Sequence, residues 1–298
     1  MNDKNPVYSH NPYDRGSFPL LVLKVNHRTC TPPNEGFRIL HWHDEVQFLY
    51  LIKGTVDAQV HQDHLLIHAG ECLFINRNAV HLIQGSDSCI YRSYIIPEKM
   101  LGFFPGSVME EQYVFPITHN PCFTHCLLTP QHEPHVPVLQ NLKKLDETYT
   151  ASAPNPFFEY DLSIQIAVLW KAFLSCLPKL PPKTDLFLRD LDRIQKLLTY
   201  IHQNYGKDLS LAAIADAAHI SKSECQRTFL KFTHTSPYQY LLRYRLHAAA
   251  SQLKSSSRTV SSIASDTGFS SVSSFIHYFK KQYGMTPTAY RTSETSLL

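Results

Sequence analysis

The last hundred residues contain one short pattern twice, and this repeat restricts the fold more than any other feature of the chain. The segment Phe229–Pro237 aligns with Phe279–Pro287 at an offset of 50. Upstream, Ile214-Ala215 aligns with Ile263-Ala264 at an offset of 49. The surrounding apolar periodicity is helical, so the repeat indicates duplication of one small helical motif. The one-residue difference in offset is expected to lie in a turn.

Each copy has the parts of a helix-turn-helix. In the first copy Ser221 is a good N-cap, because its side-chain oxygen can accept a hydrogen bond from a first-turn N–H group. Cys225 and Phe229 lie four residues apart and should share the buried face. The outer face then offers the candidate DNA contacts Lys222, Ser223, Gln226 and Arg227.

In the second copy Gly268 supplies a left-handed turn and Ser271 caps the next helix. Phe275 and Phe279 are expected to face inward. The outward set is Ser273, Ser274, Ile276, His277 and Lys280, of which Ser273, Ser274, His277 and Lys280 are the candidate DNA contacts. Between the copies, Tyr240–Leu253 predicts a helix about 21 Å long that spaces two groove-reading helices along the duplex.

The charge distribution agrees with a phosphate-binding surface at this end. Residues 186–298 carry 14 Lys+Arg against 7 Asp+Glu, a net charge of +7, whereas residues 1–185 carry 14 against 18, a net charge of −4. Basic charge concentrated in one part of a chain is typical of nucleic-acid binding. The alternative, a solvated all-helical domain, is disfavoured because two copies stand at fixed spacing.

The repeat region resembles the AraC-type transcription regulators. The resemblance runs through Leu211–Ala215, Ser221–Phe229, Tyr240–Ala250, Ile263–Phe269, Phe275–Phe279 and Gly284–Arg291. It implies binding to double-stranded promoter DNA, RNA polymerase as a partner, a homodimer, a cytoplasmic location and, more often, activation. It also implies a structural role for Arg245.

The chain departs from the usual pattern of these regulators at three positions. His234 stands where a glycine is usual, which predicts a differently shaped turn. Ser270 and His277 replace an acidic and a basic residue of the second unit. These two replacements leave the base preference of the second unit open.

Residues 18–100 predict short strands bounded by turn residues, as in a sandwich or small barrel. The segments 36–54 and 70–81 resemble the two cupin motifs, a His-x-His strand and a later strand ending in histidine. The fold class is therefore two-domain α+β. It comprises a cupin-like β-barrel sensor over residues 1–135, a helical dimerisation segment over 136–180 and an all-α double helix-turn-helix domain over 186–298.

The barrel is expected to bind a small-molecule effector such as a sugar. His41 and His43 share one strand face, and His81 enters from a neighbouring strand. We expect His41, His43, Gln47 and His81 to line the effector site, with Arg38 and Tyr50 as further candidates. The three histidines could also bind zinc, iron or manganese, but Gln47 replaces the usual glutamate ligand, so no metal cofactor is expected.

Several alternatives stay open at this point. A metal-dependent cupin enzyme with an appended helical domain is the main rival, and a regulator without any effector is another. A second His/Cys group is a weak zinc candidate and comprises His119, Cys122, His125, Cys126, His132 and His135. The amphipathic helices near 138–150 and 160–177 either form a dimer interface or pack only on their own barrel through Leu142, Leu145, Leu169, Trp170 and Phe173.

The remaining features of the sequence place the chain among cytoplasmic proteins. Seven scattered cysteines do not form a disulfide framework, and reduced thiols are the simpler interpretation. No apolar run of about 18 residues predicts a membrane span, and the polar start of the chain does not resemble a secretory signal.

Overall fold

The computed structural model describes residues 9, 11–13, 18–27, 29–34, 39–86, 88–151, 155–182 and 185–292. By its internal contacts the chain divides into two compact units between Leu188 and Arg189. None of the helices in the described ranges is long and apolar enough to cross a lipid bilayer. The candidate Arg38 lies outside the described residues.

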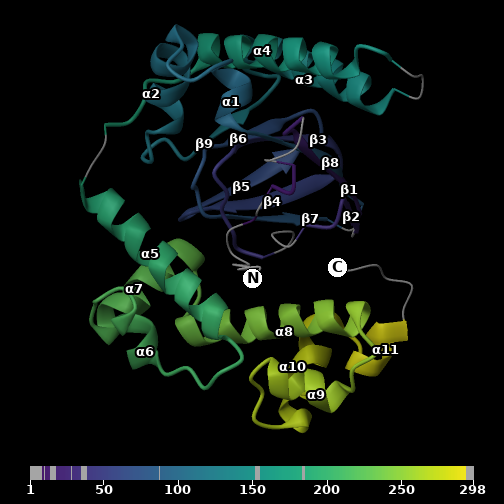
Figure 1. Cartoon of the computed structure of the whole chain (residues 1–298), viewed down its shortest axis with the longest axis vertical. Coiled ribbons are helices and arrows are strands. Elements are labelled where there is room, and N and C mark those ends of the chain that lie inside the picture. The colour runs from purple at the N-terminus through teal and green to yellow at the C-terminus, as the bar shows by residue number, and fades with distance from the viewer. Residues whose placement is uncertain are drawn as a thin grey trace. The chain divides into compact units, whose positions relative to one another are not determined.

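The N-terminal unit is built on two antiparallel sheets (Figure 1). The larger sheet has the strand order β2-β1-β8-β3-β6-β9 and the smaller has the order β5-β4-β7. Apolar side chains from both sheets form one buried cluster between them, so the sheets enclose a barrel-like core. The strands are β1 (Leu21–Asn26), β2 (Thr29–Thr31), β3 (Val46–Lys53), β4 (Thr55–Val60), β5 (Asp63–His68), β6 (Cys72–Ile75), β7 (His81–Gly85), β8 (Ile90–Ile96) and β9 (His125–Leu128).

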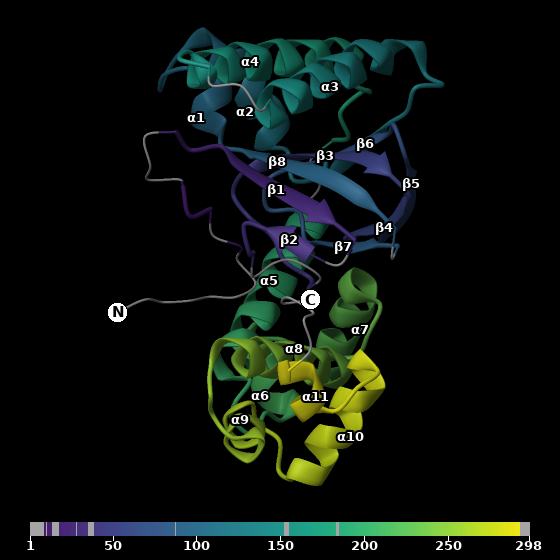
Figure 2. The same cartoon turned by 90° about the vertical axis from the view of Figure 1, so that its right-hand side faces the viewer.

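Alternate side chains of strand β3 point to opposite faces of the larger sheet and so belong to two different cores. Leu49 belongs to the cluster between the sheets, and Gln47 shares its strand face. Phe48 belongs to a second cluster on the outer face of the larger sheet. Figure 2 shows α3 (Val136–Thr150) and α4 (Phe158–Cys176) lying across that outer face.

The stretch 103–135 contains several short elements. A π-helical turn η1 (Glu110–Val114) runs into α2 (Phe115–Thr118), and η2 (Glu133–His135) precedes α3. Helix α1 (Glu98–Leu101) follows β8, and β9 completes the larger sheet. Pro116 is compatible with α2 because it lies in the first turn, where its missing N–H group costs nothing.

The C-terminal unit consists of helices. Helix α8 has 19 residues and is about 28 Å long, longer than the predicted Tyr240–Leu253. It begins earlier because Ser236, the N-cap, and Gln239, the third helical residue, form a capping box around Pro237. Figure 1 shows α6 and α7 near one end of α8 and α9 to α11 near the other. The helices are α5 (Asp185–Asn204), α6 (Leu211–Asp216), α7 (Lys222–Thr233), α8 (Pro237–Ser255), α9 (Val260–Asp266), α10 (Val272–Tyr283) and α11 (Pro287–Thr292).

A candidate DNA interface and a buried histidine cluster

Helices α7 and α10 are structural equivalents, each of 12 residues and separated by 50 positions. The Ser221 hydroxyl oxygen accepts a hydrogen bond from the Glu224 N–H group at 3.2 Å. The Ser271 hydroxyl oxygen accepts one from the Ser274 N–H group at 3.1 Å. Both predicted N-caps are confirmed, and the two helices therefore begin in the same way.

The buried and exposed faces of both helices agree with the sequence pattern. Cys225, Phe229, Phe275 and Phe279 are fully buried, as predicted. The opposite faces are therefore turned to solvent, where a ligand as large as DNA can reach them. All eight candidate contacts are exposed: Lys222, Ser223, Gln226, Arg227, Ser273, Ser274, His277 and Lys280.

The turns before the two helices explain the difference in offset. His219 and Gly268 both adopt the left-handed conformation, with φ of 53° and 83°. The next residue in each turn donates its N–H group to an alanine carbonyl of the preceding helix, at 3.2 Å for Ile220 and 3.0 Å for Phe269. The second copy then has one additional residue, Ser270, before its cap.

Arg245 on α8 joins the two helix-turn-helix units. Its Nε donates to the Tyr205 carbonyl and its Nη2 donates to the Lys207 carbonyl, both at 2.8 Å. A Cβ atom on Gly268 would lie 2.5 Å from that Tyr205 oxygen and 2.8 Å from the Arg245 side chain. The turn after α5 therefore contacts the turn after α9, and the structural role implied for Arg245 is confirmed.

Helix α5 contacts α7 through two ion pairs. Arg193 lies 2.7 Å from Glu224, and Asp190 lies 2.7 Å from Lys231. The side chains of both ion pairs are partly exposed. The pairs therefore fix the orientation of α7 on α5 more than they add to the free energy of unfolding. The sequence analysis did not anticipate these contacts, because the pairing partners are separated by 31 and 41 positions.

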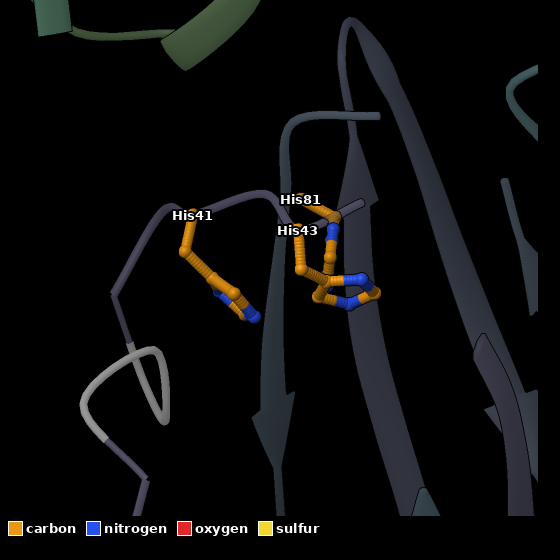
Figure 3. A group of neighbouring side chains, drawn as sticks. All are labelled: His41, His43 and His81. Atoms are coloured by element: carbon orange, nitrogen blue, oxygen red, sulfur yellow. The ribbon is translucent and has the colours of Figure 1, made fainter. Parts of the chain in front are cut away.

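In the N-terminal unit, His41, His43 and His81 converge (Figure 3). One ring nitrogen of each lies within 4.8 Å of those of the other two, and all three side chains are buried. An isolated β-bridge pairs His41 with His81, which brings the His-x-His segment beside the start of β7. The convergence expected from the sequence is therefore present.

Each histidine uses its Nδ1 atom in a hydrogen bond to a backbone carbonyl. Burial lowers the pKa of His41 to about 3 and the pKa of His81 well below its usual range, so both are neutral near pH 7. A neutral ring that donates from Nδ1 keeps a lone pair on Nε2. The accepting carbonyls belong to Ile39 at 2.9 Å, Glu45 at 3.0 Å and Ala79 at 2.8 Å.

The Nε2 atoms differ in their surroundings. The Nε2 atom of His43 lies 3.0 Å from the Gln47 side-chain oxygen, and the Gln47 amide nitrogen donates to the Ser93 hydroxyl at 2.9 Å. The buried Nε2 atom of His81 has no hydrogen-bond partner within the described part of the chain. A buried, unpaired acceptor costs free energy, so this atom favours a ligand.

The three histidines offer a donor set for a metal ion. The imidazoles of His41, His43 and His81 each direct Nδ1 at a backbone carbonyl, which matches the way proteins prepare Nε2 for a divalent transition metal. Gln47 contacts His43 through its amide and supplies no charge to such an ion. The residues therefore fit a three-histidine site without a carboxylate ligand from position 47.

Three buried polar residues beside the cluster were not predicted. Ser93 faces Gln47 from β8, and the alternation of that strand could have identified it. Glu45 lies with one carboxylate oxygen 3.7 Å from Nδ1 of His43. His61 is 2% exposed in the turn between β4 and β5. After burial and the other two histidines, its proximity is a smaller cause of the lowered pKa of His81. No sequence period indicates a residue in such a turn.

Tyr50 is separated from the histidines. It lies on β3 three positions after Gln47, so its side chain projects to the opposite face of the larger sheet. There burial raises the pKa of Tyr50, and the charges of Asp146 and Glu147 on α3 add to this effect. The prediction that Tyr50 belongs with the effector site inside the barrel is therefore corrected.

The second His/Cys group does not assemble into a ligand set. Within the described ranges, His41, His43 and His81 form the only cluster of at least three such residues with converging ligand atoms. His119 instead lies 3.1 Å from Glu98 and 2.7 Å from Arg77. The Nδ1 atom of His135 accepts a hydrogen bond from the Thr129 N–H group. The zinc interpretation of this group is therefore wrong.

Helices α3 and α4 bury one apolar face against the larger sheet, and α4 exposes a second one. The five apolar residues in question, Leu142, Leu145, Leu169, Trp170 and Phe173, are buried against their own sheet. The opposite side of α4 leaves a stripe of large apolar side chains exposed. We name Phe157, Tyr160, Ile164 and Val168 the α4 stripe; they are 67%, 74%, 58% and 45% exposed.

Comparison with known proteins agrees with both units. The helix-turn-helix domain family matches residues 214–293, and the cupin domain family matches residues 27–88. The HTH-type transcriptional regulator YdeC of Bacillus subtilis is 27% identical over 259 residues, covering 86% of this chain and 87% of YdeC.

Two further relatives match about a third of the chain. The regulatory protein SoxS of Escherichia coli is 33% identical over 98 residues, which is 33% of this chain and 92% of SoxS. An AraC-like transcription regulator of Streptomyces lividans is 35% identical over 98 residues, covering 33% of this chain and 32% of that protein. These relatives regulate transcription, so the alternative of a metal-dependent cupin enzyme does not hold. The chain is an AraC-family helix-turn-helix transcriptional regulator with an N-terminal cupin domain.

Proposed function

We propose that α7 and α10 enter successive major grooves of promoter DNA and that their eight exposed candidate residues contact it. The observation that carries this proposal is the match between two serine-capped helices whose buried and exposed faces repeat at 50 positions. Their N-termini offer N–H groups and hydroxyls to phosphate. Arg227 and Gln226 are long enough to reach guanine and adenine edges.

A mobility-shift experiment with the full chain tests this proposal. A duplex library of random sequence is the probe, because the operator is unidentified. We expect enrichment of a defined site and an affinity that falls steeply with salt. Absence of any enriched sequence, or enrichment unchanged in an Arg227→Ala/His277→Ala double variant, would exclude α7 and α10 as the reading elements.

In the barrel, the proposed ligand is a small-molecule effector that contacts His41, His43, Gln47 and His81. The buried unpaired Nε2 of His81 and the amide of Gln47 are suited to the hydroxyl groups of a sugar. Effector binding would change promoter occupancy. Most regulators that this chain resembles activate transcription through RNA polymerase, and we propose the same here. Thermal-shift screening of sugars and other metabolites tests this, with His81→Ala as the variant expected to abolish any shift.

A divalent transition metal is the second candidate ligand, because the three Nδ1 atoms are already held by carbonyls. His41, His43 and His81 would hold the ion, and the ion would supply a positive charge able to attract an anionic effector. Metal analysis of the purified chain, compared with His43→Ala, decides between the two candidates. One equivalent of bound metal that is lost in the variant favours the ion. Absence of bound metal after incubation with excess zinc favours the organic effector.

We propose that the active form is a cytoplasmic homodimer joined through the α4 stripe. The spacing of its residues, three and then four and four, places them along one helix face. Contiguous exposed apolar residues of this size mark interaction surfaces more often than free solvent faces. A second copy of the same helix is the partner that a self-complementary stripe fits.

A further inference from the structure

The outward faces of α7 and α10 differ at two matched positions. At the offset of 50, Lys222 corresponds to Val272 and Gln226 corresponds to Ile276. The first helix thus carries a charged and an amide side chain where the second carries two branched apolar side chains. Because the helices begin at equivalent caps, this difference lies in the sequence and not in the geometry.

Val272 and Ile276 are not part of the core beneath them. Val272 is 36% exposed and Ile276 is 37% exposed, whereas Phe275 and Phe279 on the inner face are fully buried. The two apolar residues lie four positions apart, so they are neighbours on one stripe of α10. The core cluster formed by α8 to α11 includes neither of them.

Their surroundings point to DNA as the occupant of this stripe. Ser273, His277 and Lys280 are exposed beside it on the same helix. The first turn of α10 places the N–H groups of the helix start next to Val272, where a phosphate is favoured. An apolar stripe inside a polar and basic border is suited to the major groove, where thymine presents its C5-methyl group.

We infer that the second unit recognises its half-site through thymine methyl groups, which Val272 and Ile276 contact, while the first unit reads hydrogen-bonding edges. This inference rests on the proposed placement of α10 in a major groove. Burial of one methyl group contributes about 0.8 kcal/mol, so each such contact corresponds to about a four-fold change in affinity.

Deoxyuridine substitution tests the inference directly, because it removes the methyl group and preserves base pairing. The full chain first selects its site from a random duplex library. Each thymine of that site is then replaced by deoxyuridine, one at a time, in both strands. We expect one or two positions at which affinity falls about four-fold. Uniform affinity across all substitutions would overturn the inference.

Two variants separate this inference from the proposed function. In Val272→Ser/Ile276→Ser the deoxyuridine effect should vanish, whereas in Gln226→Ala it should persist. The substituted side chains are partly exposed, so thermal unfolding should show both variants folded. Lys280→Ala should weaken binding equally for thymine and uracil probes. A deoxyuridine effect that survives in the serine double variant contradicts methyl recognition by α10, and failure to select any site contradicts DNA reading itself.

Discussion

His234 and Gly284 end helices α7 and α10 in the same left-handed backbone conformation, with φ of 52° and 75°. Each donates its N–H group to a carbonyl four residues earlier, that of Leu230 or Lys280. The sequence predicted that His234 would reshape this turn, and that prediction was wrong. The first copy instead forms the same turn with a residue that has a Cβ atom and therefore carries strain there.

Glycine at position 234 should stabilise the C-terminal unit. We expect His234→Gly to raise the free energy of unfolding by about 0.5–1 kcal/mol, because glycine adopts positive φ without steric cost. Gly284→Ala should lower it by about 1 kcal/mol, and since a Cβ there meets no atom within 4 Å, backbone strain alone is responsible. Urea unfolding followed by circular dichroism measures both. Changes of equal sign would contradict this account.

Arg227 and Lys222 should affect DNA binding in different ways. If Arg227 reads a base edge, Arg227→Ala should cost about 1–3 kcal/mol on the selected site and relax specificity at one position. If Lys222 contacts phosphate, Lys222→Ala should weaken all sequences alike and reduce the salt slope by about 1. Titrations at several salt concentrations distinguish these outcomes. A salt-slope change for both variants, without loss of specificity, would place Arg227 on the backbone.

The contact between the two helix-turn-helix units, made by Arg245, Tyr205 and Gly268, should affect DNA affinity most when both units bind the same duplex. Arg245→Ala removes two hydrogen bonds to carbonyls and should destabilise the C-terminal unit by about 2 kcal/mol. Gly268→Ala introduces a Cβ 2.5 Å from the Tyr205 oxygen, so the two turns must separate. Either variant should lose more affinity for a two-half-site duplex than for a single half-site. Equal losses on both probes would show that the contact does not set the spacing.

The C-terminal unit should lose stability below neutral pH. Burial lowers the pKa of His247 to about 4, and burial with the charge of His247 lowers the pKa of His202 well below its usual range. The unfolded chain binds these protons near pH 6.5, so it holds more protons than the folded chain between pH 6.5 and 4. The free energy of unfolding therefore falls as pH drops through this window, by up to about 3 kcal/mol from His247.

Hydrogen exchange in α8, corrected for the intrinsic rate, follows this loss between pH 7.5 and 5. His247→Gln should flatten the pH dependence, and His277→Gln, on an exposed helix face, should leave it unchanged. A wild-type profile that is flat across this range would contradict the assignment.

A negative charge in the α4 stripe should separate the proposed dimer. Ile164→Asp should give a monomer in sedimentation experiments without unfolding the N-terminal unit, because Ile164 is 58% exposed. Leu66→Asp is the matched control, since Leu66 is equally exposed on β5 and lies outside the stripe. A wild-type chain that is already monomeric at micromolar concentration would contradict the proposal.

The repeat explains why so much of the C-terminal unit could be predicted. Ser221, Ser271 and Gly268 have local chemistry that fixes caps and turns, so their roles follow from sequence alone. The ion pair of Arg193 with Glu224 depends instead on how α5 packs against α7. No local rule specifies that packing, and the pair was therefore missed.

The histidine cluster was predictable for a related reason. The predicted His-x-His strand is an extended segment before β3 with one isolated β-bridge at His41, yet the two-residue spacing still brings His41 and His43 together. Alternation along β3 places Tyr50 on the opposite face from Gln47. Tyr50 was misplaced because its polar hydroxyl suggests a ligand contact, whereas its odd spacing from Gln47 along β3 puts it on the other face. His61 was missed because it lies in a turn that only the paired strands bring close to His81.

Both tryptophans of the chain, Trp42 within the His-x-His segment and Trp170 on α4, belong to the N-terminal unit. Intrinsic emission excited at the indole band therefore originates in the N-terminal unit alone. Fluorescence of the intact chain on DNA can consequently test for the ligand proposed in the barrel, because α7 and α10 contribute no indole signal of their own.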